Sequence, residues 1–385
     1  MPTRSCTLHT TNRDSAQAGA ELGAGIRERM AGEAADAVIV FASSQYDHAT
    51  LLDALNDGCR PRLMVGSSSA GEFTHDAFEE GTACAIALRS DEMAFSAGLG
   101  RGLHADRIAA ARDLVGALRG MNNHGYAHRS ALVMTDALAG HADDFVEQLT
   151  LQTAGTYKLF GGGAGDDANF RKTHVFFGTE AIPDAAVCLE ILSNKPLGVG
   201  VCHGWEPATP PMRVTSADGM ILRSLNGHPA GDVFVRHAEA TGQQFDVANP
   251  IPFFLHNVLG IATDEGFRLR VPLSVAADGV VTCAADIPEG ATIHIMKPQT
   301  LSAVEATKRA LAQLDGAKPE VALFFDCVAT RLRMGREFGF ELKAVEQALG
   351  KAPYAGCNTY GQIARAEGQF NGFHNCTAVV CVIPA

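Results

Sequence analysis

Apolar residues in this chain form short continuous runs that are separated by amphipathic stretches. The run AVIVFASS at 37–44 is apolar almost throughout, which is typical of a strand buried on both faces. The stretch DHATLLDALNDG at 47–58 predicts a helix. RLMVGSSSAGEFT at 62–74 predicts a second strand with a glycine-rich end, and TACAIALRS at 82–90 predicts a third. Together they form a unit of strand, helix, strand and strand.

The same unit recurs twice along the chain. One recurrence begins at VALFFDCVATR, 321–331, and its glycine-rich segment PYAGCNTYGQIA, 353–364, closely echoes that of the first unit. A looser recurrence begins at ALVMTDALAG, 131–140, and contains YKLFGGGAGDD at 157–167. Strands that alternate with helices of this length predict an α/β fold of mixed α+β character, with mixed or parallel sheets.

The segment between the last two units has a different pattern. Residues 197–234 and 267–286 contain short apolar stretches broken by Asp-Gly and Asn-Gly pairs, which predict an antiparallel meander with a hairpin turn at Asp278-Gly279. SAVEATKRALAQL at 302–314 predicts an amphipathic helix that leads into the last unit. The chain therefore divides into two domains, and we place the boundary near the turn at 226–232.

Composition narrows the classes of function. The formal charge of −12 disfavours binding to nucleic acid or to an anionic membrane, because both surfaces would repel the chain. The first residues lack the apolar core of a secretory signal, and no apolar run approaches the ~20 residues that span a bilayer, so we expect a cytoplasmic protein without membrane insertion. The ten cysteines include no Cys-x-x-Cys pair, and we expect most of them to be reduced core residues.

A set of short motifs, in order, resembles the FIST family of sensory domains: VIVFASS, VGSSSAGEF, LFGGGAGD, GVGVCHGWEP, NGHPAGDVF, FFDCVATR, AGCNTYGQIA and FHNCTAVV. The resemblance covers the chain from about residue 35 and implies a FIST N-type domain at 33–230 and a FIST C-type domain at 231–385. It implies a sensor that binds a small ligand and signals to a partner. The chain is similar to a stand-alone branch of haem proteins that respond to nitric oxide and regulate a histidine kinase. Gln362 departs from the family, in which many relatives carry Glu at this position, so the identity of the ligand is open.

The glycine-rich segments are candidates for contact with a ligand. Glycine permits a positive φ and a close backbone approach, so exposed N–H groups can point at a bound group. Tight turns that only join strands explain the same pattern, and recurrence in three units favours a pocket. Neither GGGAGDD nor GSSSAG matches a P-loop or a dinucleotide fingerprint. The candidates are Gly66, Ser67, Gly71, Gly163, Gly165 and Gly361.

Cys327 and Arg331 follow a predicted buried strand and share one face if a helix begins there. A guanidinium near a thiol lowers the pKa of the thiol, which permits a reactive cysteine or a soft haem ligand. We favour a third use, in which Arg331 holds a carboxylate or a haem propionate in bidentate fashion beside an inert thiol. A buried structural pair is the alternative.

Three histidines lie within or beside apolar segments and are candidate axial ligands of a haem: His203, His256 and His374. At most one would serve, and for each a core or turn histidine is the simpler reading. Further candidates for polar contacts with a ligand flank the last glycine-rich segment: Asn358, Tyr360, Gln362, Asn375 and Thr377. Asn375 and Thr377 are two apart on an expected strand and therefore share one face, which is either the pocket or a polar sheet edge.

Four functions compete. The first is a haem-dependent nitric oxide sensor that regulates a cytoplasmic histidine kinase, and the second is a sensor of amino acids or of another metabolite without haem. A hydrolase with Cys327 as nucleophile and His374 as base is a third, but no G-x-S-x-G or H-E-x-x-H signature supports it, so we expect no enzyme. A purely structural adaptor is the fourth.

Overall fold

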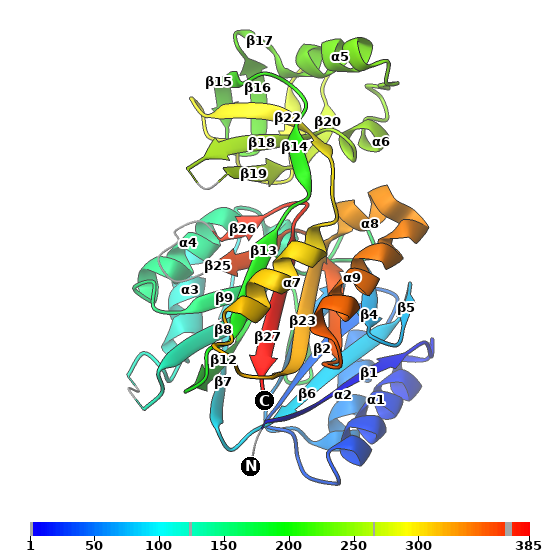
Figure 1. Cartoon of the computed structure of the whole chain (residues 1–385), viewed down its shortest axis with the longest axis vertical. Coiled ribbons are helices and arrows are strands. Elements are labelled where there is room, and N and C mark those ends of the chain that lie inside the picture. The colour runs from blue at the N-terminus through cyan, green and yellow to red at the C-terminus, as the bar shows by residue number, and fades with distance from the viewer. Residues whose placement is uncertain (1–2, 123–124, 265, 366–371) are drawn as a thin grey trace.

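A computed structural model describes residues 3–122, 125–264, 266–365 and 372–385 of the chain (Figure 1). Within these residues, three six-stranded sheets share one strand order. Each sheet contains an edge strand, a strand antiparallel to it, a central strand, a strand parallel to the central one, and a two-stranded hairpin. The predicted α/β fold of repeated strand–helix–strand units is therefore confirmed.

The first copy shows how the apolar pattern builds the unit. Its elements are β1 (Arg4–Thr10), α1 (Ser15–Arg29), β2 (Ala37–Ser43), α2 (His48–Cys59), β3 (Met64–Ser69) and β6 (Ala83–Arg89). The central strand β2 is buried at every residue, as its continuous apolar run predicts. The side chains of Asp14 and Asp47 cap α1 and α2 by accepting hydrogen bonds from backbone N–H groups three residues later. The sequence analysis did not predict β1 and α1, which complete the sheet and its helical cover.

The other two copies repeat this order. The second contains β7 (Met93–Arg101), α3 (Arg107–Gly116), β8 (His128–Thr135), α4 (Ala142–Gln152), β9 (Lys158–Gly163) and β12 (Ala185–Ser193). The third contains β13 (Gly198–Cys202), α7 (Ser302–Ala312), β23 (Pro319–Cys327), α8 (Val328–Met334), α9 (Gly339–Leu349), β24 (Tyr354–Thr359) and β27 (Ala378–Pro384). In each copy the central strand pairs in parallel with the strand that ends in the glycine-rich segment.

Each copy gives its hairpin to another copy. The hairpins are β4 (Glu72–Thr74) with β5 (Phe78–Glu79), β10 (Val175–Phe177) with β11 (Glu180–Ile182), and β25 (Gln362–Arg365) with β26 (Phe373–His374). The hairpin that follows β3 pairs with β24, the one that follows β24 pairs with β9, and the one that follows β9 pairs with β3. This cyclic exchange joins the three copies into one body.

The sheets face a shared core, and the helices cover their outer sides. Apolar residues from all three sheets form the central cluster, in which the rings of Phe41 and Phe325 meet edge to face with their centroids 5.6 Å apart. Separate clusters hold α1 and α2, α3 and α4, and α7 and α9 against the outer faces. None of the described helices is long and apolar enough to cross a membrane.

Residues 205–298 form an inserted layer, which lies at one end of the three-sheet body (Figure 1). Its elements are β14 (Trp205–Pro207), β15 (Met212–Asp218), β16 (Ile221–Leu225), β17 (His228–Pro229), α5 (Ala230–Thr241), α6 (Ile251–Phe254), β18 (Val258–Thr263), β19 (Gly266–Arg270), β20 (Pro272–Val275), β21 (Val281–Cys283) and β22 (Thr292–Pro298). The expected antiparallel pairing is confirmed, including the hairpin of β20 and β21.

One strand of the expected meander belongs elsewhere. β13 pairs with β27 and is the edge strand of the third copy, because its alternate glycines allow α7 to approach closely: a Cβ at Gly198 or Gly200 would overlap with carbonyl groups of that helix. The inserted layer thus begins after β13 and ends before α7. The boundary predicted near 226–232 falls inside the layer, between β16 and α5.

Candidate functional site

The three glycine-rich segments converge and bond to one another through their backbones. Ala70 N–H donates to the carbonyl of Asn358 at 2.9 Å, and Asn358 N–H donates to that of Gly71 at 2.8 Å. Gly163 and Tyr360 join the second copy to the third in the same way, and Gly165 donates to Ser68 of the first. Because of these bonds, the candidate residues of all three segments lie at one place in the fold.

Close strand packing accounts for the first glycine of the echoed segments. A Cβ at Gly66 would overlap with the carbonyl of Val40, and one at Gly356 with the carbonyl of Phe324, each on the strand that pairs in parallel. The second glycines, Gly71 and Gly361, have φ of +134° and +89°, a region that glycine adopts without strain. Strand packing at Gly66 and the positive φ of Gly71 therefore account for these two glycines without a ligand.

A cavity of about 640 Å³ lies where the third and second copies meet the inserted layer. Its walls are predominantly apolar. The three-sheet body supplies the floor: Ala137, Leu138, Gly140, His141, Ala142, Asp143, Ala168, Phe170, Cys327, Val328, Ala329, Leu332, Tyr360, Gly361, Phe373 and Asn375. The inserted layer supplies the opposite wall: Met220, Ile251, Leu255, Val271, Leu273, Ala284, Ala285 and Asp286. No described residue of the first copy lines the cavity.

An aromatic pair forms part of the floor. The rings of Phe170 and Tyr360 stack with their centroids 4.4 Å apart and their planes 16° apart. The Tyr360 hydroxyl donates a hydrogen bond to Asp166, which also accepts from the backbone N–H groups of the segment that carries Phe170. Phe170 is 49% exposed, which is unusual for a large aromatic side chain and leaves its ring open to contact.

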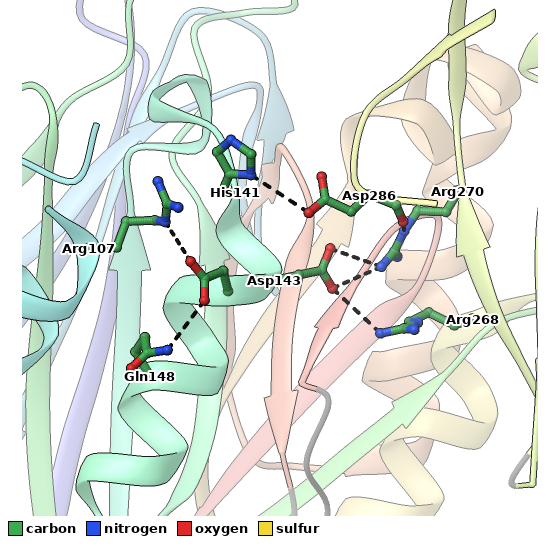
Figure 2. Close-up of polar contacts among 8 residues, drawn as sticks. Arg107, His141, Asp143, Gln148, Arg268, Arg270 and Asp286 are labelled. Carbon is green, nitrogen blue, oxygen red and sulfur yellow. Dashed lines mark hydrogen bonds and ion pairs between the residues drawn. The ribbon is translucent and has the colours of Figure 1, made fainter. Parts of the chain in front are cut away.

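Ion pairs at the cavity join α4 to the inserted layer (Figure 2). Both Asp143 oxygens accept from Arg270 Nη2 at 2.9 Å, and Arg268 Nη1 lies 3.7 Å from Asp143 Oδ1. Arg270 is fully buried, and its remaining donors bond to the carbonyls of Asp286 and Leu269. Burial raises the pKa of the Asp143 carboxyl, and the two guanidinium groups oppose this shift. The network holds the two walls together.

Two acceptor oxygens at the cavity lack a hydrogen-bond partner among the described residues: Asp286 Oδ1 and Asn375 Oδ1. Both atoms are buried, and both residues line the cavity. The other carboxylate oxygen of Asp286 lies 3.7 Å from His141 Nδ1. Because a buried polar atom without a partner is costly, a ligand donor that reaches either oxygen when the wall shifts would be stabilised there.

Cys327 lines the cavity at the start of α8, as expected for a residue that follows a buried strand. Its pKa is lowered to about 6, mainly by a hydrogen bond with the Cys376 thiol and by backbone N–H groups of Cys376 and Ala329, against the opposing effect of burial. The predicted cause was the Arg331 guanidinium, and the structure gives a different one. All ten cysteines are free and nine are buried, which confirms the expected reduced core thiols.

Arg331 and Asn358 lie behind the cavity floor and not on it. The guanidinium of Arg331 pairs with Glu80 at 3.0 Å and leaves no room for a Cβ at Gly71. Arg331 Nη1 and both polar atoms of the Asn358 amide have no partner among the described residues. The carboxylate-binding role of Arg331 stays a prediction.

Gln362 and Thr377 support the glycine-rich segment at 353–364 through hydrogen bonds in the interior of the protein. In the orientation that satisfies both ends of the Gln362 amide, its nitrogen donates to the Thr377 carbonyl at 3.2 Å, and its oxygen accepts from the Thr359 hydroxyl at 2.9 Å and from Cys327 N–H at 3.2 Å. Neither side chain lines the cavity. The expected strand over Asn375 and Thr377 is wrong, because Cys376 between them has a φ of +49° and β27 begins only at Ala378. Asn375 therefore faces the cavity and Thr377 faces Gln362.

None of the three candidate haem ligands lines the cavity. His203 bonds to the carbonyl of Phe267 through Nε2 and accepts from Trp205 N–H at Nδ1, so both ring nitrogens are engaged. His374 Nε2 bonds to the carbonyl of Ala364, and burial lowers its pKa to about 4. His256 is exposed on the inserted layer. The cavity does not fit a haem held by any of these histidines, and among the described residues no arginine or lysine lines it to receive a propionate. The described residues also contain no cluster of histidine, cysteine and carboxylate side chains that would hold a metal ion.

Four of the candidate site residues line the cavity: Cys327, Tyr360, Gly361 and Asn375. The others lie in the segments behind it: Gly66, Ser67, Gly71, Gly163, Gly165, Arg331, Asn358, Gln362, His374 and Thr377. Sequence reasoning missed Asp143, Asp286 and Phe170. One available signal was the pair Arg268 and Arg270, which lie two apart on β19 and on one face of the sheet, where buried arginines require acidic partners.

Family models match most of the chain. The FIST N domain model matches residues 36–228, and the FIST C domain model matches residues 230–365. The chain belongs to the FIST family. FIST domains are sensor domains of signal transduction, so the coarser part of the sequence-based function is supported. The two FIST models meet inside the inserted layer, near the boundary expected from the sequence.

The relatives of this FIST protein differ in how much of the chain they match. An uncharacterised protein of Mycobacterium tuberculosis, found in the strains H37Rv and CDC 1551, is 25% identical over 382 residues, which cover 96% of each chain. An uncharacterised protein of Methanocaldococcus jannaschii is 26% identical over 168 residues, which cover 40% of this chain and 33% of the relative.

Two solved structures that resemble the FIST protein over its full length are those of enzymes. The cyanuric acid hydrolase from A. caulinodans covers 99% of both chains with a TM-score of 0.39 and 7% identity. A second cyanuric acid hydrolase covers 100% of both with a TM-score of 0.33 and 9% identity. The expectation that the chain is no enzyme is corrected accordingly. At this level the likeness assigns no substrate and no catalytic residue to the FIST protein.

Proposed function

We propose that this FIST protein is a sensor whose ligand is a small, largely apolar molecule bound in the 640 Å³ cavity. The observation that carries the proposal is that the cavity draws its walls from two units, the three-sheet body and the inserted layer. A ligand that contacts both walls changes the free energy of their association, which is what a sensor requires. Sensing of a metabolite without haem fits the cavity better than haem-dependent sensing of nitric oxide.

The output of the sensor belongs to the same proposal. A separate histidine kinase is the partner that the family resemblance implies, and a cytoplasmic location suits such a pair. The inserted layer is the element that a ligand would reposition, because few ion pairs, chiefly those of Asp143 with Arg268 and Arg270, join it to α4. Motion of the layer relative to the body would then be the signal that a partner reads.

The test is binding of a neutral apolar dye, Nile red, followed by fluorescence. We expect one dye per chain and a rise in the melting temperature. Ala329→Trp, which places an indole in the cavity, should abolish binding, whereas Ala20→Trp on the exposed face of α1 should not. Equal dye binding by the folded Ala329→Trp variant and the wild type would contradict the proposal.

A cysteine-dependent hydrolase is a second candidate, because Cys327 combines a lowered pKa with a position on the cavity wall. The residue proposed as its base does not support it: the structure gives no hydrogen bond between Cys327 and His374 in the described residues, and His374 Nε2 is engaged by a carbonyl. Thiol reactivity at Cys327 therefore needs a test of its own.

A further inference from the structure

The charged side chains on the cavity wall are Asp143 and Asp286, with His141 beside them, in the part of the chain that the structure describes. Figure 2 shows that Arg268 and Arg270 turn toward Asp143. Arg270 uses its donors on Asp143 and on backbone carbonyls, and neither Arg268 nor Arg270 lines the cavity. A ligand therefore meets carboxylates and no guanidinium.

The two buried cavity atoms that lack a hydrogen-bond partner among the described residues are both acceptors. Asp286 Oδ1 and Asn375 Oδ1 are acceptors, one on the inserted layer and one on the floor. Asn375 is only 3% exposed, so a ligand donor reaches its oxygen only when the wall shifts toward the cavity. The one aromatic hydroxyl on the wall, that of Tyr360, already donates to Asp166. The cavity thus has acceptors that need a donor, and its described lining residues include no lysine or arginine.

We infer that the ligand is an apolar amine: a hydrocarbon or aromatic body carrying an ammonium or amine group that donates to Asp286 and Asn375. This inference rests on the proposed function and names the chemical class of its ligand. The apolar walls, among them the stacked rings of Phe170 and Tyr360, receive the body of the ligand. The carboxylate of Asp286 and the formal charge of −12 of the whole chain favour a cation over an anion.

The same geometry disfavours carboxylic acids. An acid would bring its charge beside Asp286 and leave Asn375 Oδ1 without a donor, and both effects weaken binding. An amino acid would carry its carboxylate into a wall that presents no lysine or arginine among the described residues. The inference therefore separates amines from the amino acids that the sequence analysis considered.

The experiment compares three probes of matched size: 2-phenylethylamine, 2-phenylethanol and 3-phenylpropanoate. Each displaces Nile red from the full-length chain, and the dissociation constants are obtained at one pH and one salt concentration. We expect the amine to bind about tenfold or more tightly than the alcohol, since a hydrogen bond to a charged group exceeds a neutral one by this order. The acid should bind more weakly than the alcohol.

Two variants test whether Asp286 causes the preference for the amine. Asp286→Asn should reduce the preference for the amine over the alcohol about tenfold and leave alcohol binding nearly unchanged. Asp57→Asn makes the same change in net charge on an exposed residue of α2 and should leave the preference intact. If Asp286→Asn does not fold, the order of the three probes on the wild type still decides.

The outcomes separate this inference from the proposal beneath it. If the alcohol binds and the amine binds no better, or if the acid equals the amine, the inference is overturned while the cavity remains a binding site. An unchanged preference in folded Asp286→Asn overturns it as well. If neither Nile red nor any probe binds, the proposed function itself fails.

Discussion

The glycine-rich segments of the first and third copies are alike in sequence and in register but differ in what they face. Ser43 pairs with Ser69 in the first copy, and Cys327 pairs with Thr359 at the corresponding place in the third. No described residue of the first segment lines the cavity, whereas Tyr360 and Gly361 of the third do. The inserted layer interrupts the third copy and lines the cavity opposite the second and third copies, so a repeated element acquires a binding surface from its position.

The residue that follows the second glycine also differs between the two copies: it is Glu72 in the first and Gln362 in the third. Glu72 accepts hydrogen bonds from Ser69 and Thr82, and Gln362 bonds to Thr359 and Thr377. Both side chains are fully buried and brace their own segments. The departure of Gln362 from the Glu expected from the family resemblance therefore changes a residue that supports its own segment through hydrogen bonds. The first copy of this chain carries Glu at the equivalent position, Glu72.

The largest expected effect comes from the glycines that the two segments share. Gly66→Ala and Gly356→Ala each force a Cβ into a strand carbonyl, so we expect each to cost more than about 4 kcal/mol of unfolding free energy or to prevent folding. Gly339→Ala, in α9 with nothing nearby, should stabilise by about 0.5–1 kcal/mol. Urea denaturation measures all three, and a mild effect at either strand glycine would contradict the packing argument.

The second largest effect is a difference in how the stability of the fold depends on pH, which Glu72 should influence and Gln362 should not. Burial raises the pKa of Glu72 to about 7 from its ordinary value of 4.5, so the folded state binds a proton more tightly than the unfolded state. Stability attributable to Glu72 is therefore full at low pH, falls as the pH rises from about 4.5 to 7, and is lost above that. The stability of Glu72→Gln relative to wild type should rise by about 3 kcal/mol between pH 4.5 and pH 8.

Two further variants complete that comparison. Gln362→Glu should introduce a pH dependence of the same sign into the third copy, because the site is equally buried. Glu28→Gln, on the exposed face of α1, should change nothing. Parallel pH profiles for Glu72→Gln and wild type in urea denaturation would show that Glu72 keeps its charge in the folded state.

The sequence predicted the repeat because each copy carries its own apolar runs and helix signals, as in β2, α2 and α9. It did not predict the exchange of hairpins, since β4, β10 and β25 are only a few residues long and their partners lie in other copies. Candidates near residues 357–377 were found through their motif. Asp286 was missed because its role depends on the inserted layer lying against α4, which no local pattern encodes.

Among the positions that differ between the two copies, we expect the smallest change in unfolding free energy at Cys327. There the third copy has a sulfur atom where Ser43 of the first copy has an oxygen. Cys327→Ser places in the third copy the residue that Ser43 supplies in the first, and we expect it to change the unfolding free energy by less than about 1.5 kcal/mol. Its effect on reactivity should be large, because a thiol with a pKa of about 6 is mostly thiolate at neutral pH.

Alkylation by iodoacetamide, read by peptide mass spectrometry, tests this reactivity. Cys327 should be modified first among the ten cysteines, with a rate that rises through about pH 6, and Nile red in the cavity should protect it. Cys381 is the internal control, because it is buried in the core, its pKa is raised, and it does not line the cavity. Equal rates at Cys327 and Cys381 would remove the basis for thiol chemistry in the third copy, and the contrast with the first copy would then lie in the aromatic and polar wall alone.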